Sequence, residues 1–194
     1  MGTVLTILVI VVVLLAAAAA FFYFQRRRSD ELRDRFGPEY ERTVEQSRGR
    51  HEAERELRGR ERRVSRLEIT PLSRESAATY RDEWADVQQS FVDRPAGAVM
   101  AADRLVLRMM RESGYPVDEF DQRVDDISVE HPEVAAHYRE GHRVAVAQAR
   151  GEADTEDLRR AVTAYRHLVD ALLDDSETTT RARRSRPTDT KEQA

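Results

Sequence analysis

Residues 4–24 read VLTILVIVVVLLAAAAAFFYF, and this stretch contains no charged side chain. At the helical rise of about 1.5 Å per residue, the stretch reaches about 31 Å, which matches the hydrocarbon thickness of a bilayer. In lipid every backbone polar group must be paired within the segment, so the β-branched valines are expected in a helix. The aromatic residues 21–24 fall where rings favour the membrane interface. We therefore predict a transmembrane anchor over residues 1–25.

The flanks of this segment indicate its orientation. Three uncharged side chains precede it, whereas Arg26, Arg27 and Arg28 follow it at once. Positively charged flanks remain on the cytoplasmic side of a membrane. We expect a single-pass protein of the cell membrane with its N-terminus outside and the remainder in the cytoplasm. The alternative is a cleaved signal peptide and an exported domain, but such peptides begin with a basic segment and have a shorter apolar core.

The composition indicates an all-α protein. Charged residues make up 35% of the 194 residues and aromatic residues only 7%, a balance typical of exposed amphipathic helices. The chain contains no cysteine, which excludes disulfides, thiolate nucleophiles and cysteine-ligated zinc.

Charge is distributed unevenly along the chain. Residues 26–66 hold 14 Arg against 10 Asp and Glu, a net charge of +4. Residues 67–174 hold 13 Arg against 22 Asp and Glu, a net charge of −9. A domain this acidic repels phosphate backbones, so no nucleic-acid partner is predicted. The basic juxtamembrane segment is expected to face the lipid bilayer, where arginine attracts anionic headgroups.

Residues 26–68 are predicted to form charged juxtamembrane and stalk helices. Gly37 and Pro38 end the first helix and begin the next, because proline disfavours helix in the residue before it. The second helix is expected to run to about Leu67. Its apolar residues are too few for a strong coiled-coil seam, so we expect a solvated helix, with weak self-association as the alternative.

Residues 69–175 are predicted to form a compact bundle of four longer helices and one short one. Ser73 is expected to cap the first helix, and Asp154 with Asp157 the last. Gly114 is expected to end one helix, and Gly141 to allow close approach of a neighbouring helix. Apolar residues at intervals of three and four predict a core, which includes Tyr80, Trp84, Phe91, Val106, Phe120, Tyr138, Tyr165 and Leu172. Residues 176–194 lack such a stripe and are predicted to be a disordered tail.

One group of side chains is a weak candidate for a metal site. Glu133, His137 and Glu140 share a helical face at spacings of four and three. The zinc signature H-E-x-x-H is absent, however, and Gly141 interrupts its inverted form. The plain interpretation is a polar surface. The acidic run over residues 118–126 lacks the ligand pattern of a calcium loop and is also expected to be a solvated face.

No glycine-rich phosphate loop, nucleophile elbow or catalytic carboxylate pair is recognisable, so neither catalytic residues nor a cofactor are predicted. The leading hypothesis is a membrane-anchored cytoplasmic helical interaction or scaffold module with a protein partner. The alternatives are a small-ligand or metal-binding enzyme or sensor domain inside the bundle, and an exported helical domain.

Several phrases of the chain resemble an uncharacterised family of actinobacterial single-pass membrane proteins. They include RFGPEYERTVE at residues 35–45, AERELRGRERR at 53–63, LEITPLS at 67–73 and GEADTEDLRRAVTAYRHL at 151–168. The resemblance covers almost all of the chain from the apolar stretch to Leu173. It implies an anchor followed by a helical domain, and it implies no active-site residues.

Overall fold

The computed structural model describes the backbone of residues 2–184, and their side chains except those of residues 3–9, 11–13, 18, 21, 22, 24, 25 and 179–184. The described residues form helices joined by turns and loops and include no strand. The chain divides into two compact units, Met1–Arg58 and Gly59–Ala194, which we call unit 1 and unit 2.

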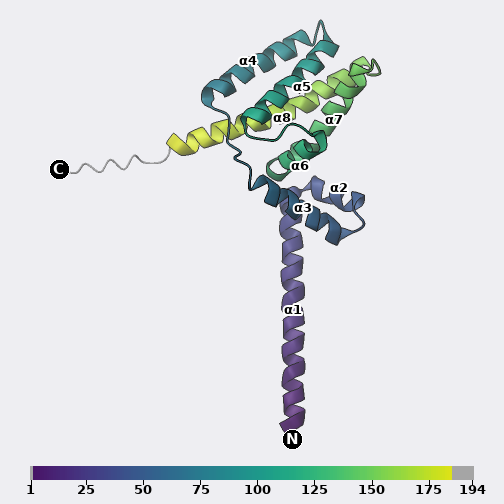
Figure 1. The fold of residues 1–194 in the computed structure, drawn as a ribbon, viewed down its shortest axis with the longest axis vertical. Coiled ribbons are helices and arrows are strands. Elements are labelled where there is room, and N and C mark those ends of the chain that lie inside the picture. The colour runs from purple at the N-terminus through teal and green to yellow at the C-terminus, as the bar shows by residue number, and fades with distance from the viewer. Residues whose placement is uncertain (1, 185–194) are drawn as a thin grey trace, which may run out of the picture. The chain divides into compact units, whose positions relative to one another are not determined.

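Unit 1 consists of α1 (Gly2–Phe36), α2 (Pro38–Gln46) and the larger part of α3 (Arg50–Val64) (Figure 1). The predicted break between the first two helices is confirmed. The backbone of Gly37 has a φ of 46°, in the left-handed region that glycine tolerates, and Pro38 occupies the first turn of α2.

The predicted transmembrane segment lies within α1. Most side chains of residues 4–24 are outside the described set. Among the residues that the structure does describe, no helix combines the length and the apolar character needed to cross a membrane. The span therefore remains a prediction from the sequence.

The stretch after Pro38 differs from the single solvated helix expected there, and that prediction is wrong. The chain leaves the helix at Ser47, whose ψ of 164° is extended, and α3 begins at Arg50. The break allows α2 and α3 to bury their few apolar side chains together with the end of α1. Among the described side chains of unit 1, the buried apolar residues are Leu32, Phe36, Tyr40, Ala53 and Leu57. A sparse apolar seam thus forms a small core instead of a stalk.

Unit 2 contains the end of α3 and the predicted bundle of four longer helices and one short one. Its helices are α4 (Arg74–Ser90), α5 (Pro95–Glu112), α6 (Phe120–Glu130), α7 (Pro132–Ala149) and α8 (Thr155–Arg184). Helix α8 lies against α4, α5 and α7, and the short α6 lies against α7 (Figure 1). The bundle therefore has one long helix in contact with three others.

The ends of these helices follow the predicted local chemistry. The Ser73 hydroxyl accepts a hydrogen bond from the backbone N–H of Ser76 at 3.0 Å. The side chains of Asp154 and Asp157 each accept from the other's backbone N–H, at 2.8 and 3.2 Å. Gly114 follows α5 with a φ of 91°. These caps satisfy backbone groups that a helix end leaves unpaired.

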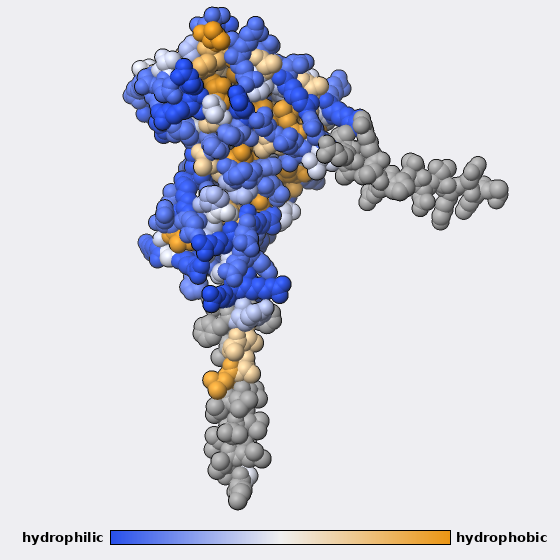
Figure 2. Space-filling model, turned by 180° about the vertical axis from the view of Figure 1, so that it is seen from behind, coloured by the Kyte–Doolittle hydropathy of each residue, from blue (hydrophilic) through white to orange (hydrophobic). Residues whose placement is uncertain are grey.

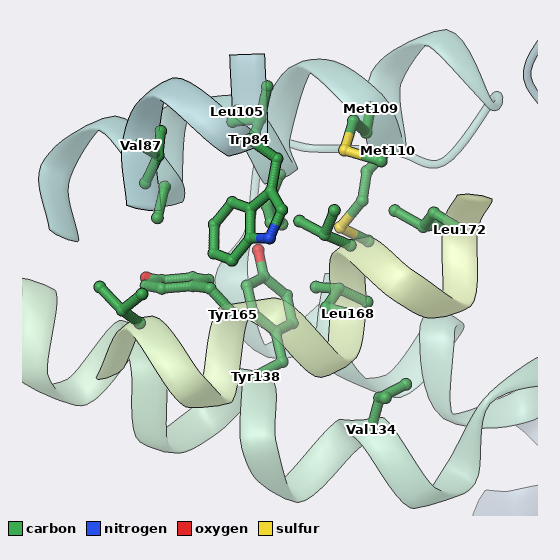
Figure 3. Close-up of a cluster of buried hydrophobic side chains, with 14 of the residues drawn as sticks. Trp84, Val87, Leu105, Met109, Met110, Val134, Tyr138, Tyr165, Leu168 and Leu172 are labelled. Atoms are coloured by element: carbon green, nitrogen blue, oxygen red, sulfur yellow. The ribbon is translucent and has the colours of Figure 1, made fainter. Parts of the chain in front are cut away.

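The core of unit 2 contains the residues that the helical periodicity indicated. The buried members of that set are Tyr80, Trp84, Val106, Tyr138, Tyr165 and Leu172, while Phe91 and Phe120 are half-buried against the edge of the core. Figure 3 shows Trp84 of α4, Tyr138 of α7 and Tyr165 of α8 pointing into one cluster with Met109 and Leu168. Aromatic rings from three helices thus meet in the interior.

The predicted start of the disordered tail is wrong. Helix α8 continues through Ser176 to Arg184, and the buried Ser176 hydroxyl donates to the Leu173 carbonyl at 2.6 Å. Arg81 of α4 donates to the carboxylate of Glu177 at 2.5 Å, which ties this extension to the bundle. The remainder of the predicted tail, residues 185–194, lies outside the described residues.

Candidate functional site

The carboxylates proposed as weak metal ligands take part in ion pairs. Glu140 accepts from Arg143 at 2.8 Å and lies 3.9 Å from Arg160 of α8. The hydrogen bond from Arg143 is the main cause that lowers the pKa of Glu140, so the carboxylate stays ionised and paired. Glu133 lies 3.7 Å from the imidazole of His131. The two carboxylates are therefore paired with different basic groups.

His137, the third member of that set, stacks on His167 of α8 with ring centroids 4.0 Å apart and planes 19° apart. Burial lowers the pKa of His137, and the neighbouring His167 lowers it further. The ring is therefore neutral at neutral pH. Among the described residues, no group of three or more His, Asp and Glu side chains is arranged to hold a metal ion.

A polar cluster that the sequence did not predict lies where α5, α7 and α8 meet. The Tyr165 hydroxyl donates to Oδ1 of Asp103 at 2.6 Å, and Nδ1 of His142 lies 3.5 Å from the same oxygen. Burial opposes ionisation of Asp103, but the hydrogen bonds from His142 and Tyr165 outweigh it and lower the pKa of this carboxyl. Burial raises the pKa of Tyr165, and Asp103 raises it further, so the phenol stays protonated.

Helix α6 closes this cluster on one side. The Phe120 ring stacks on His142 with centroids 3.8 Å apart and planes 15° apart. The buried Arg123 donates through Nε to the Tyr138 hydroxyl at 3.0 Å and through its guanidinium to the Val117 carbonyl. One carboxylate and one guanidinium thus join four helices. The pair of Asp103 and His142 reaches the surface, since their side chains are 16% and 25% exposed.

A second unpredicted polar contact joins the end of α3 to α6. Arg63 Nε donates to Oδ1 of the fully buried Asp126 at 2.7 Å, and Arg60 lies 3.0 Å from Asp125. This part of the acidic run was expected to be solvated, and that prediction is wrong for Asp126. The arginines that neutralise it lie in the preceding segment of the chain, more than sixty residues away.

Unit 1 has its own buried carboxylate at Glu54 on α3. It accepts from the Ser29 hydroxyl at 2.5 Å, from the Tyr40 hydroxyl at 3.2 Å and from Arg58 at 3.1 Å. Arg50 donates to the Tyr40 hydroxyl at 2.9 Å, and this bond is the main cause that raises the pKa of Arg50. The cluster holds α2 and α3 against the end of α1.

The arginines that indicated membrane topology directly precede this cluster. Arg26, Arg27 and Arg28 are exposed, and the next residue, Ser29, is buried. Arg27 lies 3.5 Å from Glu31, an exposed pair of the kind that adds little stability. The three cations are therefore available to groups outside unit 1.

The surface and the comparisons provide the remaining observations. Figure 2 shows hydrophilic residues over most of the visible face, with hydrophobic residues in small separate areas. A comparison of the chain with protein-family models, curated proteins and solved structures found no match.

Proposed function

We propose that the chain is a single-pass membrane protein whose helical bundle acts as an interaction or scaffold module on the cytoplasmic side. The observation that carries this proposal is the continuity of α1. One helix, Gly2–Phe36, runs from the uncharged residues 4–24 into the folded unit 1, where Leu32 and Phe36 are buried. An uncharged helical stretch of about 20 residues is long enough to cross the hydrocarbon core of a bilayer, and α1 continues from it without a linker.

The charged groups of the bundle support an interaction role more than a catalytic one. Asp103, Glu140 and Asp126 are engaged by side chains of other helices, and these contacts stabilise the fold. The net charge of −9 over residues 67–174 is the main surface property left for recognition. We expect a protein partner with a basic face, because complementary charge steers association.

A topology experiment tests the anchor and its direction. Full-length protein with a C-terminal reporter should remain in the membrane after alkaline extraction and give cytoplasmic reporter activity. A reporter active only outside the cell would support export of the bundle and contradict the orientation. Release by alkaline extraction would contradict the anchor itself.

A partner experiment tests the interaction role. Tagged full-length protein should capture a reproducible partner, and the complex should weaken as ionic strength rises, since exposed charges are screened. Exchange of exposed Asp and Glu residues of the bundle for neutral amides should weaken the complex in the same way. The matched control exchanges an equal number of exposed Asp and Glu residues of unit 1. Absence of a reproducible partner after crosslinking in cells would contradict the scaffold role.

The surface-reaching pair of Asp103 and His142 favours a second candidate function, the binding of a small ligand by the bundle. A carboxylate that orients an imidazole is a common element of binding and catalytic sites. Thermal-shift screening of detergent-solubilised protein would detect it as a rise in the unfolding temperature that His142→Gln abolishes. An unchanged unfolding temperature across metal ions and metabolite classes would remove this candidate.

A further inference from the structure

We propose that the folded part of unit 1, residues 29–58, lies directly against the headgroup layer of the membrane, and that unit 1 binds anionic phospholipids through four exposed arginines. These are Arg26, Arg27 and Arg28 on α1 and Arg48 in the turn between α2 and α3, and we call them the headgroup arginines. The inference rests on the proposed transmembrane anchor. It names anionic phospholipids as the lipid class that the protein binds, and it adds Arg48 to the arginines of α1 as a second binding element.

The folded part of unit 1 begins close to the lipid core. The predicted span ends at Phe24, and Ser29, five residues later, is already buried in unit 1 and bonded to Glu54. Five residues of helix cover about 7.5 Å. The headgroup region on each side of the hydrocarbon is about 5–7 Å thick. The folded part of unit 1 therefore begins at the outer edge of the headgroup layer, and no stalk separates it from the headgroups.

The second step places the turn between α2 and α3. Helix α2 lies against α1, with Glu41 2.6 Å from Arg33 (Figure 1). After the turn, Arg50 of α3 lies 3.8 Å from Glu54, and the Ser29 hydroxyl of α1 donates to the same carboxylate at 2.5 Å. The contacts thus move from residue 33 toward residue 29 of α1, in the direction of the predicted membrane. The turn between α2 and α3 therefore lies at the level of residues 29–33 of α1.

The third step is the chemistry of the exposed side chains. Successive residues on a helix are about 100° apart, so Arg26, Arg27 and Arg28 spread over about 200° around α1. Arg48 is exposed, and its backbone N–H donates to Glu52 at 3.1 Å, which fixes the turn. Guanidinium groups bind phosphate through paired hydrogen bonds, and each basic residue near an anionic leaflet adds attraction. Two basic elements at one level therefore fit anionic phosphate headgroups.

The test uses the full-length protein reconstituted into nanodiscs of phosphatidylcholine and phosphatidylglycerol. The motionally restricted fraction of each lipid, added as a spin-labelled probe, is measured by electron paramagnetic resonance. We expect phosphatidylglycerol to be enriched about threefold to tenfold over phosphatidylcholine at about 0.05 M salt, and less at about 0.5 M.

The variants separate the two basic elements. Arg26→Gln, Arg27→Gln and Arg28→Gln together should remove most of the enrichment, and Arg48→Gln alone should lower it about twofold. The lysine versions of the three changes should retain most of it, because they keep the charge. The matched control neutralises three exposed arginines of unit 2, Arg104, Arg150 and Arg166, and should keep the full enrichment.

The outcomes distinguish this inference from the function on which it rests. Protein that inserts but restricts both lipids equally would overturn the inference and leave the anchor intact. An unchanged enrichment in Arg48→Gln would overturn the placement of the turn. Protein that does not insert into the nanodiscs would overturn the proposed anchor. Retained helical circular dichroism in every variant shows that a lost enrichment does not come from unfolding.

Discussion

Two glycines inside helices have opposite surroundings, which makes them a matched pair of sites. A Cβ at Gly141 of α7 would lie 3.1 Å from the ring of Tyr165, whereas a Cβ at Gly59 of α3 would meet nothing within 4 Å. Tyr165 is fully buried and bonded to Asp103, so its ring cannot move aside. The small residue at 141 is thus required by packing.

We expect Gly141→Ala to lower the free energy of unfolding of unit 2 by about 1–2 kcal/mol, because overpacking outweighs the gain in helix propensity. Gly59→Ala should instead raise stability by up to about 1 kcal/mol. Urea unfolding of the detergent-solubilised protein, followed by circular dichroism, measures both. Equal stabilisation by the two substitutions would contradict the close approach at Gly141.

A second prediction at the scale of single residues concerns His131, whose Nε2 lies 2.8 Å from a carboxylate oxygen of Asp175. Burial lowers the pKa of His131, but the hydrogen bond and charge of Asp175 outweigh it, and the net pKa is raised. The folded state therefore holds the proton more tightly than the unfolded chain. The stabilisation is complete below the unfolded pKa of about 6.5 and is lost as pH rises through the folded pKa.

We expect Asp175→Asn to cost about 1 kcal/mol of stability at about pH 5.5 and much less at about pH 8.5. The figure is small because Asp175 is 45% exposed and the pair is partly screened. Unfolding temperatures at the two pH values measure the difference. The control is Asp174→Asn, which removes an exposed carboxylate next to it. The prediction is wrong if both variants show the same pH dependence.

At the scale of helices, the sequence predicted several helix ends correctly, but it did not predict the break at Ser47 inside a helix that was expected to be continuous. The predicted ends depend on residues only a few positions apart, so they can be predicted from the local sequence. They are the ends at Gly37 and Pro38, at Ser73 and at Asp154. The break at Ser47 has a different origin. It lets α2 and α3 bury Leu57 with the end of α1, and a local pattern does not contain that partner.

Charged side chains that lie in the interior explain the other differences between the sequence predictions and the structure. Because Glu54 interrupts an apolar seam, the sequence predicted a solvated helix. In the structure, the Ser29 and Tyr40 hydroxyls of two other helices donate hydrogen bonds to the buried Glu54 carboxylate. Asp103 likewise lies three and four residues from Val106 and Val99 on the apolar face of α5. That position was a signal of a partly buried carboxylate. Its partners, His142 and Tyr165, were not predictable, because they come from helices about forty and sixty residues later.

The buried carboxylate of unit 1 leads to a prediction at this scale. Glu54→Ala leaves the Ser29 and Tyr40 hydroxyls without their acceptor and Arg58 without its counter-ion, and we expect it to cost about 2–3 kcal/mol. Glu54→Gln keeps an acceptor oxygen and should cost about half as much. Backbone hydrogen exchange of α2 and α3 measures the loss. Unchanged exchange in Glu54→Ala would contradict a supporting role for the cluster.

At the scale of the whole molecule, the two units have separate cores. The residues around Glu54 belong to unit 1, and those around Tyr165 belong to unit 2. Apart from α3, which runs from unit 1 into unit 2, each unit is built from its own helices, so each has its own balance of burial and chain entropy. A protein of this kind departs from two-state unfolding. The two units are therefore expected to open at different denaturant concentrations.

Hydrogen exchange of the full-length protein at increasing urea should show amides of α2 becoming exposed in one step and amides of α5, α7 and α8 in another. Glu54→Ala should move only the first step, and Gly141→Ala only the second, because neither side chain belongs to the core of the other unit. If either substitution moves both steps equally, the cores form one cooperative unit. If the two steps are separate, a partner bound to the bundle should slow hydrogen exchange in α5, α7 and α8 and leave exchange in α2 unchanged. The same hydrogen-exchange measurement detects this difference.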